Sequence, residues 1–194
     1  MNRDAARAAI RDFLIALDHD PQKNPELAET PARVVEAFAD ELLAGYGRDL
    51  AGLVTKDSSP APAQAGLIAV RDIAVATVCP HHLMPAIGRA SVIYRPGERI
   101  LGIGVIARLV DACARRLVLQ ETIGQDVVSA LMTHAGARGA LCEITLRHGC
   151  LSARGAHEVD ARVTTVARAG ELSEAEALLA LGRVGTAPSG GGAA

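Results

Sequence analysis

The sequence predicts an α+β protein in which an N-terminal helical arm precedes a domain with the element order β-β-α-α-β-β. Two observations lead to this prediction. Apolar residues recur at helical spacing in several segments, and other segments combine β-branched residues with partial alternation. The chain has 194 residues, 49% of them hydrophobic, which is enough for one domain with a sizeable core. No internal repeat or second domain is evident.

The arm is expected over residues 1–56. In 3–18, apolar residues follow helical spacing and charged residues lie largely on the other face, as in an amphipathic helix. Thr30 and Pro31 are interpreted as an N-cap followed by proline at the first helical position, which opens a helix that runs to about residue 44. Residues 57–66 carry turn formers without periodicity, so they are expected to be a loop between the arm and the main domain.

The main domain is expected over residues 67–170, and the tail covers 171–194. The predicted strands are 67–77, 87–94, 140–148 and 163–167, and the predicted helices of the domain are 105–117 and about 123–132. The tail is expected to form a short helix over 171–181 and to end in a disordered, low-complexity segment.

Charge and composition exclude some classes of partner. A net charge of −2 and only four aromatic residues provide neither the basic face nor the stacking platforms of a nucleic-acid binder. No segment approaches the roughly 20 apolar residues of a membrane span, and the N-terminus lacks the apolar core of a signal peptide. We therefore expect a cytoplasmic protein, whose four cysteines are thiols or metal ligands and not disulfides.

Cysteine and histidine gather between the first two predicted strands, in Cys79-Pro80-His81-His82. Cys79 and His82 are three residues apart, so one tight loop can offer a thiolate and an imidazole to a single ion. Cys150, from a second fragment over 147–155, could supply a third ligand and leave the fourth position of zinc open for water. A buried thiol with surface imidazoles and no metal fits this spacing equally well.

The other polar residues of these fragments suit a substrate held at the metal. His81 and His148 each lie within two residues of a proposed ligand and suit acid–base chemistry near neutral pH, although a structural role fits them as well. Glu121 follows Gln120, and its carboxylate can accept two N–H donors from a guanine edge; helix capping is the alternative.

Arginines in the same regions suit phosphate. Guanidinium forks at Arg108 and Arg154 match phosphate oxygens, but a solvated surface is the commoner explanation of such charges. Cys113 and Cys142 occupy apolar patterns, and we interpret both as core residues.

With these residues assembled, the chain resembles the GTP cyclohydrolase I family. The resemblance runs from about Thr30 to about Thr165 and is densest in 79–82, 102–108, 114–121 and 148–155. It implies a T-fold subunit, in which sheets from several subunits close a barrel with helices outside, and a homodecamer built from two pentamers. It also implies active sites at subunit interfaces.

The resemblance further implies a role for each matching residue. The implied zinc ligands are Cys79, His82 and Cys150, the catalytic histidines His81 and His148, the guanine-binding pair Gln120 and Glu121, and the triphosphate contacts Arg33, Arg108 and Arg154. In the implied reaction, zinc-activated water attacks C8 of GTP, formate is released, and 7,8-dihydroneopterin triphosphate forms on the route to pterins and tetrahydrofolate.

The chain departs from the family pattern mainly near the triphosphate. It has Gly102-Ile103-Gly104-Val105 where the family usually has Gly-Leu-Ser-Lys, and 156–161 carries two carboxylates and lacks the usual serine. Pro80 also replaces a usual glutamate. Two alternatives therefore remain: a divergent cyclohydrolase that acts on a less phosphorylated or modified guanine compound, and a non-catalytic T-fold protein that binds a purine or pterin.

Overall fold

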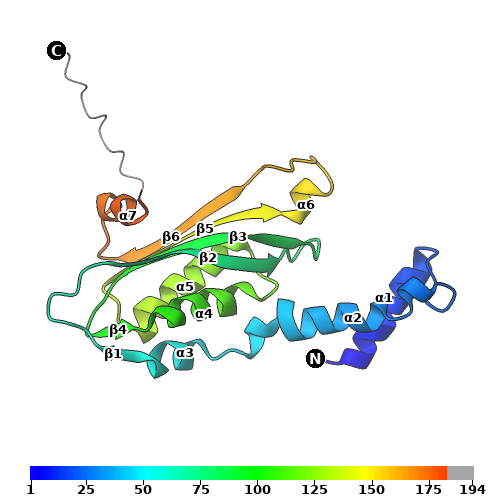
Figure 1. Cartoon of the computed structure of the whole chain (residues 1–194), viewed down its shortest axis with the longest axis horizontal. Coiled ribbons are helices and arrows are strands. Elements are labelled where there is room, and N and C mark those ends of the chain that lie inside the picture. The colour runs from blue at the N-terminus through cyan, green and yellow to red at the C-terminus, as the bar shows by residue number, and fades with distance from the viewer. Residues whose placement is uncertain (183–194) are drawn as a thin grey trace, which may run out of the picture.

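A four-stranded antiparallel sheet is the centre of the structure, a computed structural model that describes residues 1–182. The sheet has the order β2-β3-β5-β6, and its strands are β2 (Ile68–Val78), β3 (Pro85–Arg95), β5 (Gly139–His148) and β6 (Val163–Gly170). Helices α4 (Ile103–Ala114) and α5 (Gln120–His134) cover one face, and α7 (Glu174–Ala180) lies on the other side (Figure 1). The β-β-α-α-β-β order of the main elements is confirmed, and the fold is mixed α+β.

The main core lies between the sheet and the two long helices. Leu109 of α4 and Ile123 of α5 are fully buried against strand residues such as Val92 and Ile144. These are the residues whose helical or alternating spacing predicted the elements. Burying each such side chain stabilises the fold by about 1.5–3 kcal/mol. This packing holds the strands in place, and with them the loop and the short helix that follow the ends of β2 and β5.

A smaller core holds α7 on the opposite face. Ile93 of β3 and Leu141 of β5 pack with Leu172 and Ala177. The helix begins with a capping box, in which Ser173 and Glu176 exchange hydrogen bonds between side chains and backbone. The carboxylate of Glu176 also pairs with Arg95 of β3, so the predicted tail helix is confirmed as a docked element. The predicted disordered end lies outside the described residues.

Short elements were missed by the sequence analysis. The predicted loop over 57–66 contains β1 (Ser58–Pro60), which pairs with β4 (Arg99–Leu101), and α3 (Leu50–Lys56) and α6 (Gly149–Ser152) are additional helices. Such elements are too short to show a period of their own. Their hydrogen bonds and contacts come from distant segments: Val54 of α3, for example, is fully buried in the main core.

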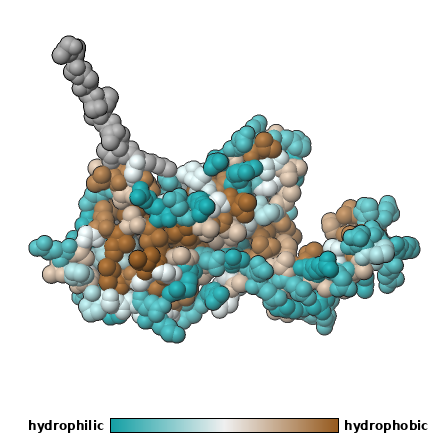
Figure 2. Space-filling view, viewed as in Figure 1, coloured by the Kyte–Doolittle hydropathy of each residue, from teal (hydrophilic) through white to brown (hydrophobic). Residues whose placement is uncertain are grey.

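The arm extends away from the body (Figure 1). It consists of α1 (Arg3–Ala16), the short turn η1 (Pro25–Leu27), α2 (Thr30–Glu36), the π-helical η2 (Ala37–Leu42) and η3 (Ala44–Gly47). The expected N-cap was wrong by one residue, because Thr30 is already helical and the N-cap position is Glu29, whose side chain makes no capping hydrogen bond. No residue of α1 is buried, and Figure 2 shows a mainly hydrophilic arm beside a body with a broad hydrophobic area. Among residues 1–182, no helix is long and apolar enough to cross a bilayer.

Candidate active site

The loop between β2 and β3 brings the first cysteine and histidines together. It is closed at its base by two main-chain hydrogen bonds, from Cys79 N to Met84 O and from Leu83 N to Cys79 O, both 2.9 Å long. Leu83 adopts a positive φ of 53°, which helps the chain reverse within so few residues. As a result, Sγ of Cys79 lies 3.6 Å from Nδ1 of His82.

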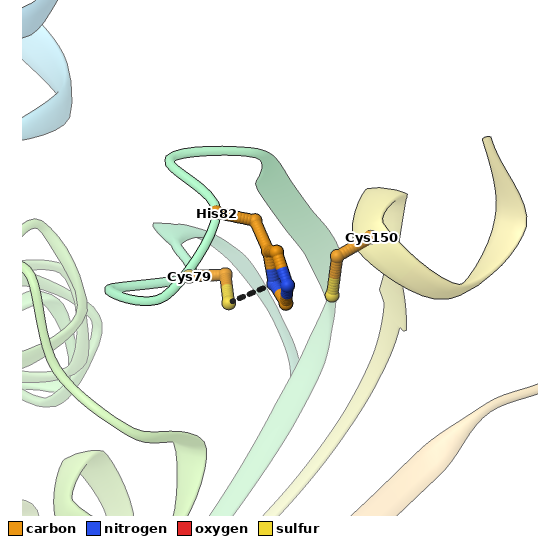
Figure 3. A group of neighbouring side chains, drawn as sticks. All are labelled: Cys79, His82 and Cys150. Atoms are coloured by element: carbon orange, nitrogen blue, oxygen red, sulfur yellow. Dashed lines mark hydrogen bonds between the residues drawn. The ribbon is translucent and has the colours of Figure 1, made fainter. Parts of the chain in front are cut away.

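Cys150 approaches the same point from another element. It lies in α6, directly after β5, and the strand register places His148 at the end of β5 opposite Ala86 of β3. Figure 3 shows the three side chains pointing toward one another from the β2–β3 loop and from α6. The ligand atoms of Cys79, His82 and Cys150 all lie within 4.8 Å of one another.

This donor set fits zinc. Two thiols and one imidazole are the ligand types that zinc prefers, and bond lengths of about 2.0–2.3 Å place tetrahedral donors roughly 3.5–3.8 Å apart. The Cys79–His82 separation already lies in that range. Burial is the main cause that raises the pKa of the Cys150 thiol, and the hydrogen bond with Cys79 raises it further. A divalent cation would oppose both effects, because it binds the thiolate.

Gln120 and His148 form a hydrogen-bonded pair beside this group. The Nε2 of Gln120 donates to the main-chain oxygens of Ile144 and Val163, at 2.9 and 3.0 Å, and to Oγ1 of Thr165 at 3.2 Å. Because carbonyl oxygens can only accept, the amide oxygen must be the atom that lies 2.8 Å from Nε2 of His148. Nε2 of His148 therefore carries a proton, and Nδ1 is left for a ligand.

Electrostatics act on His148 in two directions. Partial burial lowers the pKa of the imidazole, because desolvation disfavours the charged form. The carboxylate of Glu121 opposes this effect and raises the pKa. Burial is the larger of the two effects, so the pKa of His148 lies below its ordinary value.

A cavity of about 320 Å³ joins these groups. Its polar lining contains every predicted site residue except the three arginines, namely Cys79, His81, His82, Gln120, Glu121, His148 and Cys150. Apolar side chains of Val118, Leu119 and Leu151 complete the wall. These apolar residues carry no chemical signal of their own in the sequence, apart from their position beside the polar motifs.

The predicted triphosphate contacts do not meet in the single chain. Arg33 lies on α2 in the arm, Arg154 is exposed after α6, and Arg108 pairs with Asp57 at 2.7 Å. Val105, at one of the positions where the sequence departs from the pattern it resembles, is fully buried in the main core. This position therefore cannot contact a ligand without rearrangement of α4.

A mixed α+β fold with a Cys-His-Cys donor group, two further imidazoles and a carboxylate around one cavity has the composition of a metal-dependent enzyme. Comparison with known proteins agrees that the chain is an enzyme. The family model for GTP cyclohydrolase I matches residues 6–181. "GTP cyclohydrolase 1" of Leifsonia xyli subsp. xyli is 39% identical over 173 residues, which are 89% of this chain and 90% of that protein.

Two further relatives give the same result. "GTP cyclohydrolase 1" of Campylobacter lari is 34% identical and covers 87% of each chain. "GTP cyclohydrolase 1" of Pelagibacter ubique is 33% identical, over 87% of this chain and 83% of its own length. The chain belongs to the GTP cyclohydrolase I family.

Proposed function

We propose that this protein is a zinc-dependent GTP cyclohydrolase that opens the imidazole ring of GTP at C8, releases formate and gives 7,8-dihydroneopterin triphosphate. Membership of the family supports an enzyme of the GTP cyclohydrolase I type. The observation that carries the proposal is the Cys79–His82–Cys150 group on the wall of the same cavity as His148 and Glu121.

Zinc held by Cys79, His82 and Cys150 would leave one position for water and supply a hydroxide-like nucleophile near neutral pH. The remaining roles belong to the chain itself. Glu121 lies exposed at the first turn of α5, where its carboxylate can accept two parallel N–H bonds from the guanine edge. That contact would orient the purine with its imidazole ring toward the metal-binding group.

His148 is the residue best placed to move a proton at N7 of the purine. Its Nε2 proton is held by Gln120, so Nδ1 of the doubly protonated imidazolium form is the nitrogen that would give a proton to the substrate. His81 lines the same cavity, and its Nδ1 lies 4.0 Å from Sγ of Cys79. We assign His81 a second proton-transfer role. The apolar wall around Leu119 would exclude bulk water from the ring while these transfers occur.

We further propose that the site is completed by neighbouring subunits, in a barrel built from several sheets and a decamer of two pentamers. Strands β2 and β6 form open edges of the sheet, and pairing between subunits would satisfy their free backbone groups. Exposed apolar residues of the arm, Phe13, Ile15 and Leu17, would be covered by another subunit. Arg33, Arg108 and Arg154, which lie in different parts of a single chain, would then contact one substrate from neighbouring subunits.

The test is formate release from GTP by the purified full-length protein. We expect turnover that is lost after chelation, restored by zinc, and absent in Cys150→Ser, whose bound zinc should fall well below one per subunit. His81→Ala is the matched variant: it should lose activity but keep zinc. Zinc-independent formate release, or full zinc content in Cys150→Ser, would contradict the proposed metal centre.

A second candidate is a cyclohydrolase for a less phosphorylated guanine compound. It is favoured by the pairing of Arg108 with Asp57 and by the burial of Val105. Both observations reduce the number of side chains available to bind the triphosphate of GTP. Separate assays with GTP, GMP and guanosine distinguish the candidates: a preference for GMP or guanosine supports the second, and efficient turnover of GTP alone excludes it. A non-catalytic purine-binding protein would release formate from none of the three.

A further inference from the structure

A second cavity, of about 350 Å³, lies on the sheet face turned away from α4 and α5. It is separated from the active-site cavity by the thickness of the sheet. Neighbouring residues of a strand point to opposite faces, so Arg147 lines this second cavity whereas His148 lines the active-site cavity.

Four arginines line the cavity, and they come from both edges of the sheet. Arg71 lies in β2, Arg89 in β3, Arg147 in β5, and Arg162 directly precedes β6. Strands are spaced by about 4.8 Å, so the outer strands of a four-stranded sheet are roughly 14 Å apart. The cationic lining therefore extends across the whole width of the sheet.

A β-bulge in β2 adds to this cationic lining. The register shifts between Val70, which pairs with Val92, and Ile73, which pairs with Ala90, so Arg71 and Asp72 together oppose Ser91 alone. Asp72 has a positive φ of 58°, and its main-chain oxygen accepts a hydrogen bond from Arg89 at 2.8 Å. The extra residue turns Arg71 toward the same face as Arg89, as bulges beside binding sites often do.

The four arginines also differ from most others in the chain. Many arginines elsewhere pair with a carboxylate, for example Arg95, Arg116 and Arg138. Within residues 1–182, none of the four lining arginines forms a salt bridge with a carboxylate. Arg89 and Arg147 occupy diagonal positions on adjacent strands, where like charges repel. A bound anion would relieve this repulsion.

Two carboxylates share the cavity, those of Asp72 and Glu143. They leave a net excess of two positive charges among the lining residues. Hydroxyl groups of Ser91 and Thr145 add neutral hydrogen-bond donors between the arginines. A single carboxylate would occupy one guanidinium fork, whereas a chain of phosphates can engage several forks across the sheet.

We propose that this cavity binds an oligophosphate anion at a site separate from the active-site cavity. The proposal does not depend on GTP turnover or on the metal. An anion held by Arg147 would lie one residue from His148 along β5, on the opposite face of the strand. The two cavities would therefore be occupied at the same time and not in competition.

The test uses inorganic tripolyphosphate as the probe and calorimetric titration of the full-length protein at low ionic strength. All measurements are made in an Arg154→Gln background, which removes a predicted phosphate contact near the active-site cavity. We expect binding in this background, and we expect Arg147→Gln to weaken it by about tenfold or more, the loss typical of a charge-assisted contact. Arg162→Gln, in the loop before β6, should have a similar effect.

Arg168→Gln is the matched control. Arg168 is exposed in β6 on the same face of the sheet but does not line the cavity, so its removal should change the affinity by less than about twofold, as expected for a screened charge that does not contact the anion. Absence of tripolyphosphate binding in the protein that carries Arg154→Gln alone would overturn the proposal. Equal weakening by Arg147→Gln, Arg162→Gln and Arg168→Gln would also overturn it, because it would show diffuse attraction to a basic surface. Circular dichroism of each variant verifies the fold, and Arg162→Gln decides the outcome if Arg147→Gln fails to fold.

Discussion

The amide oxygen of Gln120 accepts a hydrogen bond from Nε2 of His148 over 2.8 Å, and the amide nitrogen of the same side chain is anchored to the main chain of β5 and β6. Gln120 is only 5% exposed, so its polar atoms are occupied within the protein. This arrangement connects the orientation of one imidazole to the packing of α5 against the sheet.

Replacing Gln120 by methionine should keep the volume but remove these contacts. The oxygens of Ile144 and Val163 and the Nε2 proton of His148 would lose their partners, which should lower the free energy of unfolding by about 1–3 kcal/mol. We expect kcat to fall by roughly tenfold or more, with a much smaller change in KM, because the ring would no longer be oriented. Denaturant unfolding and steady-state kinetics provide the measurements.

Thr165→Val is the control for that change. It removes the third acceptor of the Gln120 amide without touching His148. Activity close to that of the parent is expected. A loss of kcat as large as in Gln120→Met would show that local packing, and not the contact to His148, determines the rate.

The four cysteines should divide into two reactivity classes. Cys113 and Cys142 are fully buried, and burial raises the pKa of each thiol to about 12. Iodoacetamide at pH 8 should therefore modify Cys79 and Cys150 in the metal-free native protein and spare the other two. Zinc should protect Cys79 and Cys150. Peptide mass spectrometry checks this, and equal labelling of Cys142 under native conditions would contradict it.

Gly88 should tolerate no side chain. A Cβ at this position would lie 2.0 Å from the main-chain oxygen of Thr145, on the neighbouring strand. Gly88→Ala should thus force β3 and β5 apart and lower the free energy of unfolding by about 1–3 kcal/mol. Gly66→Ala is the comparison, because a Cβ there meets nothing within 4 Å, and its effect should stay within about 0.5 kcal/mol. Chemical denaturation of both variants measures the difference.

Docking of α7 should weaken in acid. Hydrogen bonds from the backbone and side chain of Ser173, and then the contact with Arg95, lower the pKa of Glu176 below its usual value of 4.5. A lowered pKa in the folded state means that this contribution is present above about pH 4.5 and is lost as the pH falls through the folded-state pKa. Hydrogen exchange of residues 174–180 should therefore gain protection as the pH rises through this range, after correction for intrinsic rates. In Glu176→Gln this pH dependence should be absent, and an unchanged dependence in the variant would contradict the assignment.

The long elements could be predicted from the sequence because each carries its own signal. The apolar residues of α4 and α5 recur at helical spacing, and these are the residues that pack on the sheet. The pairing of Cys79 with His82 was also readable, since three residues of separation within a tight loop limit how far apart the side chains can lie. Short elements such as β1 and α6 carried no such signal, because their stability depends on partners far away in the chain.

The sequence by itself therefore determined the order of the main elements, the resemblance to the family and the candidate site residues. Only the tertiary structure decided which of those residues meet. The β3–β5 register brings Cys150 to the Cys79 loop, and the packing of α5 places Gln120 against His148. The bulge in β2 likewise directs Arg71 to the face that Arg89 and Arg147 share. Strand register and helix packing are long-range properties, and no local spacing in a sequence encodes them.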